Sequence, residues 1–338
     1  MEHEVFIDPV NEESTVLNET STVNLPLKTA NRIAQNYLES LSSDNLYEAE
    51  SALKDINTLV QRVIHQTIKI GDADDWHNFA VDIARKDLFD LSCDLLECGL
   101  SIYPKNIDLL ADYLQYGISC GRTETCKEIY KTLCKIPKIR WGWRGYSFSV
   151  NYLKYLWDRS DSEKELKKLQ DEMLNLAILF REYLPEDEES YRCEADIYKM
   201  LHRGSEEEST LRAALSNLKI APKCALRLSD LLFDRGDYDE ALEQIQRGLN
   251  DATQTQLSVN ESYLYYLMGL TKLALAQQAG TIVSEEVACD IYSDFEIALK
   301  QEKRAAYINT MKAKTIILRS KSGVPIPDKN EELCYLVQ

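Results

Sequence analysis

The chain has 338 residues, of which 44% are hydrophobic, so it is long enough to build one elongated domain or two globular ones around a hydrophobic core. Its 39 Lys and Arg against 56 Asp and Glu give a formal charge of −17, which repels phosphate backbones and anionic membranes and favours basic partners. This balance argues against a nucleic-acid-binding protein, and no run approaches the ~18 apolar residues of a membrane span.

The N-terminal residues are polar and acidic. Residues 1–26 are rich in Ser, Thr, Asn and Glu and end in Pro26, which predicts a flexible arm and no signal peptide. Residues 27–72 predict an N-terminal helical pair, with helices over 28–41 and 46–70. Nine Cys at irregular spacings, with no Cys-x-x-Cys pair, indicate reduced thiols and a cytoplasmic protein.

The rest of the chain has a helical pattern. Gly and Pro are scarce, at 12 and 8 residues, and no long stretch alternates with period two, so we expect an all-α fold. The clearest segment is LSDLLFDRGDYDEALEQIQRGL, residues 228–249, in which two short amphipathic helices flank a Gly-Asp turn. A helical pair this small cannot bury its apolar stripes alone and needs copies of itself.

This segment resembles a tetratricopeptide repeat (TPR), a 34-residue helix–turn–helix with fixed small and large positions. Numbered from Pro222, the matching residues at positions 7, 8, 11, 20, 24 and 27 are Leu228, Ser229, Leu232, Ala241, Ile245 and Gly248. Similar copies can be counted from Ala73, Ile107 and Arg140. The resemblance covers about residues 73–300 and implies a right-handed α-solenoid, in which helical pairs stack side by side.

The resemblance also implies a division of the chain. We expect six TPR-like repeats, at 73–106, 107–139, 140–187, 188–221, 222–255 and 262–301, followed by a capping helix at 302–320 and a C-terminal tail at 321–338. A charged insertion at 158–170 displaces the second helix of the third repeat. Ser205 with Glu208 matches the capping box of a helix start.

Signatures of enzymes are missing from the sequence. It has no phosphate-binding loop, dinucleotide fingerprint, His-Glu-x-x-His pair or nucleophile elbow, and its four His are scattered. We therefore predict a non-enzymatic protein without a cofactor or a metal site.

A partner site follows from the resemblance, because first helices line the concave surface of a TPR array and positions 2, 5, 9, 12 and 13 face it. The first two repeats then offer Asp74, His77, Arg85, Asp108 and Gln115. The predicted partner-binding residues are Trp141, Arg144, Phe148, Asn151, Tyr152, Arg192, Lys199, Tyr263 and Tyr266. Among them, Arg144 suits a carboxylate and the aromatic rings suit an apolar group, unless Trp141 and Phe148 pack on the insertion instead.

One known TPR function can be tested by position. Repeats that clamp the C-terminal carboxylate of chaperones use Lys, Asn and Arg at five positions, which here hold His77, Val81, Asp112, Trp141 and Gly145. The clamp is therefore missing, and this argues against a co-chaperone.

The favoured function is a scaffold or regulatory subunit that binds another protein or peptide, within a larger complex. One alternative is an acidic escort for a basic client, and another is a regulator that senses a small peptide. A third is binding of single-stranded RNA through the cations Lys131, Lys135, Lys138, Arg140 and Arg144.

Overall fold

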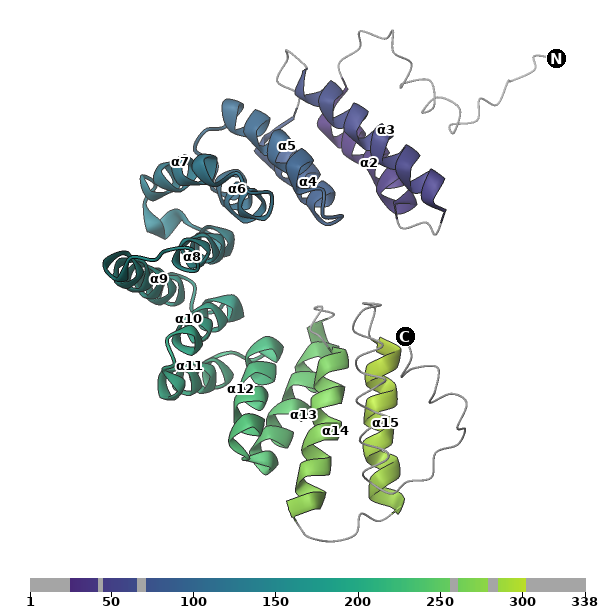
Figure 1. The fold of residues 1–338 in the computed structure, drawn as a ribbon, viewed down its shortest axis with the longest axis vertical. Helices are drawn as coiled ribbons and strands as arrows, with labels where there is room; N and C mark the ends of the chain where they lie inside the picture. The colour runs from purple at the N-terminus through teal and green to yellow at the C-terminus, as the bar shows by residue number, and fades with distance from the viewer. Residues whose placement is uncertain (1–24, 42–44, 66–70, 256–260, 279–284, 302–338) are drawn as a thin grey trace, which may run out of the picture. The chain divides into compact units, whose positions relative to one another are not determined.

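The computed structural model describes residues 25–41, 45–65, 71–255, 261–278 and 285–301. Every regular element in these ranges is helical, which confirms the predicted all-α fold (Figure 1). The chain divides into two compact units, residues 1–162 and 163–338, and this division falls inside the predicted third repeat. The first 24 residues of the arm predicted over 1–26, the capping helix and the tail lie outside the described residues.

The first unit consists of consecutive helices and one short 3₁₀ turn. They are α2 (Leu27–Ser40), α3 (Leu46–Ile64), α4 (Ala73–Ala84), α5 (Phe89–Ile102), α6 (Ile107–Ser119), α7 (Thr123–Cys134), η1 (Lys138–Arg140) and α8 (Trp143–Trp157). Helices α2 and α3 lie within residues 27–72, where a helical pair was expected, and α3 ends at Ile64.

The second unit is likewise a series of consecutive helices. Its helices are α9 (Glu163–Tyr183), α10 (Glu188–Met200), α11 (Gly204–Asn217), α12 (Pro222–Arg235), α13 (Tyr238–Thr255), α14 (Glu261–Gln278) and α15 (Glu285–Gln301). The charged insertion does not form a separate element: residues 163–170 are the first turns of α9, which makes this helix 21 residues long.

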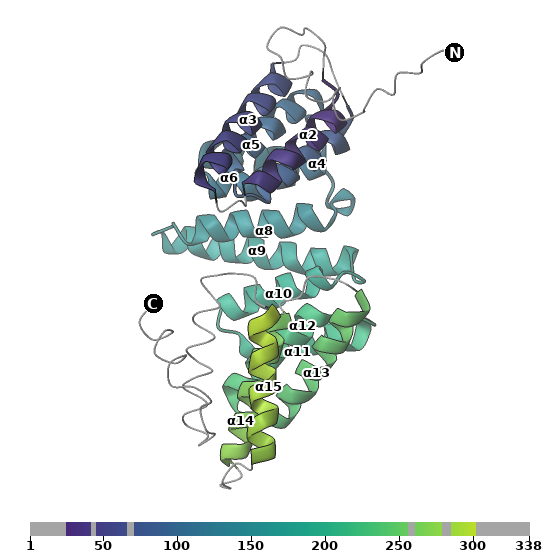
Figure 2. The ribbon, with the colours of Figure 1, turned by 90° about the vertical axis from the view of Figure 1, so that its right-hand side faces the viewer.

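Within each unit, most successive helices pack against one another, and so do several alternate ones (Figures 1 and 2). In the first unit α2 contacts α4, α4 contacts α6 and α6 contacts α8, while in the second α10 contacts α12 and α12 contacts α14. Contacts between alternate helices are typical of stacked helical hairpins. Stacking buries the apolar stripes that a single hairpin would leave exposed to solvent.

Small residues allow the close packing inside each hairpin. Ala80 on α4 and Ser92 on α5 are fully buried, and the Ser92 hydroxyl donates a hydrogen bond to the Ala80 carbonyl at 2.8 Å. A Cβ on Gly99 would lie 3.1 Å from the Cβ of Trp76, so larger residues would push α4 and α5 apart. These residues occupy the small positions that the repeat pattern predicted.

Helix starts follow local capping rules, with one correction. Asp72 and Asp75 form a reciprocal capping box on α4. The box predicted for Ser205 and Glu208 is wrong, because α11 begins at Gly204 with Arg203 as its N-cap. The Ser205 hydroxyl binds the Glu206 carboxylate instead.

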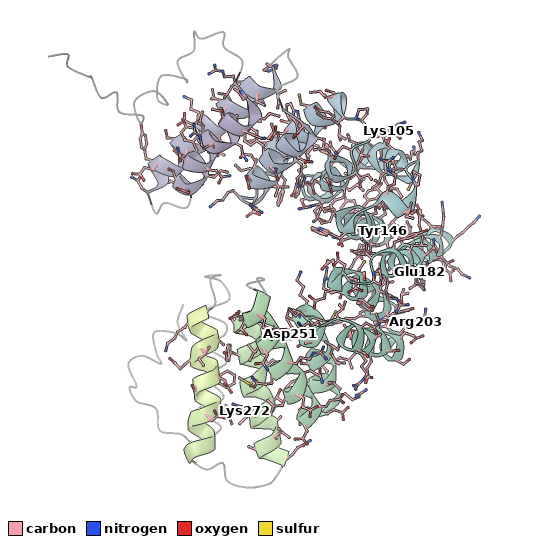
Figure 3. The ribbon with its side chains drawn as sticks, turned by 180° about the vertical axis from the view of Figure 1, so that it is seen from behind. Lys105, Tyr146, Glu182, Arg203, Asp251 and Lys272 are labelled. Carbon is pink, nitrogen blue, oxygen red and sulfur yellow. The ribbon has the colours of Figure 1, made fainter. Side chains whose placement is uncertain are left out.

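A charged cluster joins the last described hairpin. Lys272 on α14 lies between that helix and α15 (Figure 3), with its Nζ 2.7 Å from Asp290 Oδ2 and 2.8 Å from Asp294 Oδ2. Asp294 is only 5% exposed. The ammonium group therefore compensates a carboxylate that burial would otherwise leave uncompensated.

Candidate functional site

The cationic and aromatic stretch at residues 138–148 separates into a buried part and an exposed part. Trp141 is only 2% exposed, its ring lies 5.4 Å from that of Tyr146, and Lys138 Nζ sits 3.3 Å from its ring centroid. The Tyr146 hydroxyl in turn donates to the Lys138 carbonyl at 2.8 Å (Figure 3). The expectation that Trp141 presents its side chain to a partner is thus corrected, because this indole is buried in the core just before α8 begins.

Trp143 is the exposed indole of this stretch. It is the first residue of α8 and is 38% exposed. Its ring meets that of Phe148 edge-on at 5.6 Å, and the Arg144 guanidinium carbon lies 4.6 Å from its centroid. We call Trp143, Arg144 and Phe148 the α8 surface. Cation–π contact and edge-to-face packing hold this surface together.

Counted from Arg140, Trp143 falls at position 4 of its repeat, which is not one of the partner-facing positions 2, 5, 9, 12 and 13, so the repeat pattern did not select it. Trp141 follows η1 in extended backbone and precedes α8, which begins at Trp143, so helical positions do not describe it. The repeat count holds within α8, where Tyr146, Ser147 and Val150 at positions 7, 8 and 11 are buried.

Arg144 already has a carboxylate neighbour. Asp112 on α6 is fully buried, with Oδ1 3.6 Å from Arg144 Nε and Oδ2 2.6 Å from Nδ1 of His77 on α4. Burial raises the pKa of the Asp112 carboxyl, while His77 and Arg144 oppose that rise. A partner's carboxylate at Arg144 would therefore compete with Asp112 for the same guanidinium.

The remaining predicted residues of α8 are engaged within the unit. The Asn151 amide donates to Gln115 Oε1 at 3.0 Å, which ties α8 to α6. Tyr152 is 2% exposed and lies 5.2 Å from the ring of Tyr130, and burial raises the pKa of its hydroxyl to about 12. The prediction that Tyr152 faces a partner is corrected, since its side chain belongs to the core.

The second unit contains an open groove between α10 and α12, with a volume of about 380 Å³. We call it the α10–α12 groove. Its lining residues are Glu189, Arg192, Asp196, Lys223, Leu226, Arg227 and Asp230. Three carboxylates and three cations surround the apolar side chain of Leu226, so the groove carries both signs of charge.

Arg192 is held inside this groove by its own helix. Its Nη1 donates to Asp196 at 2.6 Å, its Nε donates to Glu189 at 3.0 Å, and a second nitrogen also contacts Glu189. The hydrogen bond with Glu189 raises the pKa of the guanidinium. The predicted role of Arg192 as a cation open to a partner's carboxylate is corrected, because two carboxylates already compensate it.

The other predicted residues of this unit lie in different settings. Lys199 is exposed. The Tyr263 hydroxyl donates to Asp230 Oδ1 at 2.8 Å, so α14 is linked to the groove. Tyr266 is only 8% exposed and packs 5.7 Å from the ring of Phe295, which makes it a core residue and corrects its predicted exposure.

The predicted residues thus fall into two sets. Arg144 and Phe148 come together in the first unit, where Trp143 joins them. Arg192 lines the groove of the second unit, and Tyr263 is joined to it through Asp230. Partner binding by either set stays a prediction.

In the described part of the chain, no group of three or more His, Cys, Asp or Glu side chains could hold a metal ion. No helix among the same residues combines the length and the apolar composition that crossing a bilayer requires.

No protein-family model and no curated protein matches this sequence. Solved structures are similar in fold. A thermophilic TPR protein of Thermus thermophilus, TTC0263, is 19% identical with a TM-score of 0.46, over 60% of this chain and 98% of that one. The human IFIT1 dimer with PPP-AAAA is 16% identical with a TM-score of 0.47, over 99% and 74%. PilF of Pseudomonas aeruginosa is 11% identical with a TM-score of 0.39, over 85% and 97%.

The fold of this chain resembles that of TPR proteins, as its helical hairpins and their small packing positions indicated. The similarity concerns the fold alone.

Proposed function

We propose that this protein is a non-enzymatic scaffold or regulatory subunit that binds an extended segment of another protein in the α10–α12 groove. One observation supports the proposal above all. The groove is lined from positions 2, 5 and 9 of two successive first helices, and only Arg227, at position 6, lies outside this set. Positions 2, 5 and 9 are the ones that the TPR resemblance assigns to partner contact.

The charges of the groove define the ligand that fits. Lys223 is 45% exposed with its Nζ 3.7 Å from Glu189, and Arg227 is 3.1 Å from Glu207. A ligand of a single charge would meet like charges at one side of the groove. A peptide with an apolar side chain for Leu226 and both an acidic and a basic residue satisfies all of these groups.

The proposal predicts a loss of partner when the groove is changed. We expect Lys223→Glu with Leu226→Asp to reduce recovery of the partner in affinity purification by at least about tenfold, because one buried leucine contact is worth ~1.5–3 kcal/mol. The matched control is Lys219→Glu with Tyr183→Asp, which makes the same charge change at exposed residues outside the groove.

Partners recovered with the control but lost with the groove variant would support the proposal. Equal recovery with both variants would refute it. Circular dichroism and thermal unfolding of both variants establish that they fold.

The alternatives give different outcomes in the same purification. RNA that co-purifies in low salt and is lost with Trp143→Ala would favour RNA binding at the α8 surface, where Lys135 and Arg140 are also exposed. A basic protein that is released as salt rises, with no effect of the groove variant, would favour an acidic escort. A short peptide that alters the hydrodynamic radius would favour a sensing regulator.

A further inference from the structure

Helix α3 in the first unit has apolar residues on two faces. One face is buried and includes Ile56, Leu59 and Val60. An adjoining face carries Leu46 and Leu53, which are seven residues apart and 73% and 43% exposed, and Tyr47, which is 79% exposed, lies at its edge. Isolated exposed apolar residues are ordinary, but neighbouring ones along one helix mark a contact surface.

A groove continues this exposed face toward α5. Its volume is about 570 Å³, and its apolar lining consists of Leu53 from α3 with Leu88, Phe89 and Leu91 from the start of α5. We call it the α3–α5 groove. Lining residues 50, 53, 54 and 57 of α3 follow helical spacing, and together with Leu46 they extend over about 16 Å, or three helical turns.

The rim of this groove is acidic. Glu50, Asp87 and Asp90 line it with a single cation, Lys54. Asp90 is partly compensated, since its Oδ1 lies 3.3 Å from Arg122 Nη2, but its side chain remains 75% exposed. An apolar floor with carboxylates at its edge is complementary to an amphipathic helix that has Lys or Arg beside its apolar stripe.

We propose that the α3–α5 groove binds a basic amphipathic helix of a separate protein. Both helices of the groove are second helices of their hairpins, so this site is independent of the α10–α12 groove, which first helices form. The partner's apolar residues contact Leu53 and Phe89, and its cations pair with Glu50 and Asp87.

Other segments of this chain fit less well. Residues 1–24 contain six acids and no Lys or Arg, so the rim repels them. Whole copies of the chain carry −17 each and repel one another. Residues 303–321 are the exception, with six Lys and Arg and no acid, and self-association through them is therefore a distinguishable outcome of the test.

The test measures binding of a fluorescent peptide to the full chain by anisotropy. The probe is a helical peptide of about 18 residues made of Leu and Lys, and its counterpart replaces every Lys with Glu. We expect the Lys peptide to bind and the Glu peptide not to bind. Leu53→Asp should weaken binding at least about tenfold, and Leu53→Ala should weaken it several-fold, at both about 50 and about 200 mM salt.

A charge-matched pair of variants separates a specific site from general attraction to an acidic protein. Glu50→Lys with Asp87→Asn changes the rim, while Glu182→Lys with Asp171→Asn makes the same change on exposed residues of α9. We expect the rim variant to weaken binding several-fold more than the α9 variant.

Three results would overturn the proposal. They are equal losses in the two charge variants, no effect of either change at Leu53, and concentration-dependent self-association in light scattering that Leu53→Asp abolishes. The last result would assign the groove to a second copy of this chain.

Discussion

Asp112 is a buried carboxylate that contacts two neighbouring helices of the first unit. It is fully buried on α6, between His77 of α4 and Arg144 of α8. Its raised pKa shows that burial outweighs these two partners, so the ionised form opposes folding. The contacts of Asp112 therefore fix how α4, α6 and α8 are arranged, and they contribute little to stability.

This balance predicts a pH-dependent effect of Asp112→Asn. The folded-state pKa is above the ordinary value of 3.8, so the cost of ionising Asp112 is absent below that pH and grows as pH rises through the raised pKa. We therefore expect the free energy of unfolding of Asp112→Asn minus that of the wild type to increase over that interval, so the variant becomes relatively more stable as pH rises. Urea unfolding at a series of pH values measures it.

Asp108→Asn, on the same helix but only partly buried, is the control. A difference between wild type and Asp112→Asn that stays constant, or that changes in the opposite direction, would contradict this account of Asp112.

At the scale of elements, close contact between helices depends on missing side chains. A Cβ at Gly117 of α6 would lie 2.5 Å from the Sγ of Cys126 on α7, and Cys126 is fully buried. The two helices can approach this closely only because position 117 has no side chain.

We expect Gly117→Ala to lower the free energy of unfolding by up to about 2 kcal/mol, because an overpacking cost of ~1–3 kcal/mol opposes the ~1 kcal/mol that Ala gains in a helix. Gly204→Ala is the control, since nothing lies within 4 Å of the added Cβ, and its effect should stay within about 0.5 kcal/mol. Adding Cys126→Ala should restore part of the loss. Chemical denaturation of the four proteins measures these effects, and a Gly117→Ala variant as stable as the wild type would show that α6 and α7 separate at little cost.

At the scale of the whole molecule, most packing is between neighbouring helices. Each described hairpin contacts the next hairpin of its own unit, with no sheet among the described residues to connect distant parts of the sequence. In such arrays the stability is approximately a sum of the contributions of each repeat and of its neighbour contacts.

This organisation predicts local effects of core substitutions. Leu228→Ala removes a side chain that is 1% exposed on α12, at a cost of about 2–5 kcal/mol. We expect hydrogen exchange, followed by mass spectrometry, to show loss of protection first in α11, α12 and α13. Leu110→Ala, at an equally buried site on α6, should reverse the pattern and affect α5, α6 and α7. Uniform loss of protection along the chain in both variants would mean that the molecule unfolds as one cooperative unit.

Much of the fold could be predicted from the sequence, because helical periodicity and small packing positions are local signals. Ala80, Ser92 and Gly99, at positions 8, 20 and 27 counted from Ala73, are buried, and so are Leu228 and Ile245 of the clearest repeat. The start of α11 was predicted wrongly because several acidic residues follow Ser205. Spacing alone does not tell which of their carboxylates the Ser205 hydroxyl contacts.

The candidate site was less predictable. A repeat pattern assigns faces by counting along a helix, but Trp141 lies in extended backbone between η1 and α8, so counting could not predict that its indole is buried. Similarly, the sequence shows that Arg192 is a cation. That Glu189 and Asp196 compensate its charge depends on the distances between the guanidinium and the two carboxylates, which the sequence does not give.

The residue pattern is enough to predict amphipathic helical hairpins of a TPR-like kind, because periodicity and residue size act over one or two helical turns. Which side chains remain available to a partner follows from the packing of the hairpins. Exposure depends on atoms brought together from separate hairpins: α6 supplies Asp112 to Arg144, and α3 and α5 together form a groove that neither helix has alone. Such contacts depend on the exact spacing between helices, which residue patterns within one helix do not encode.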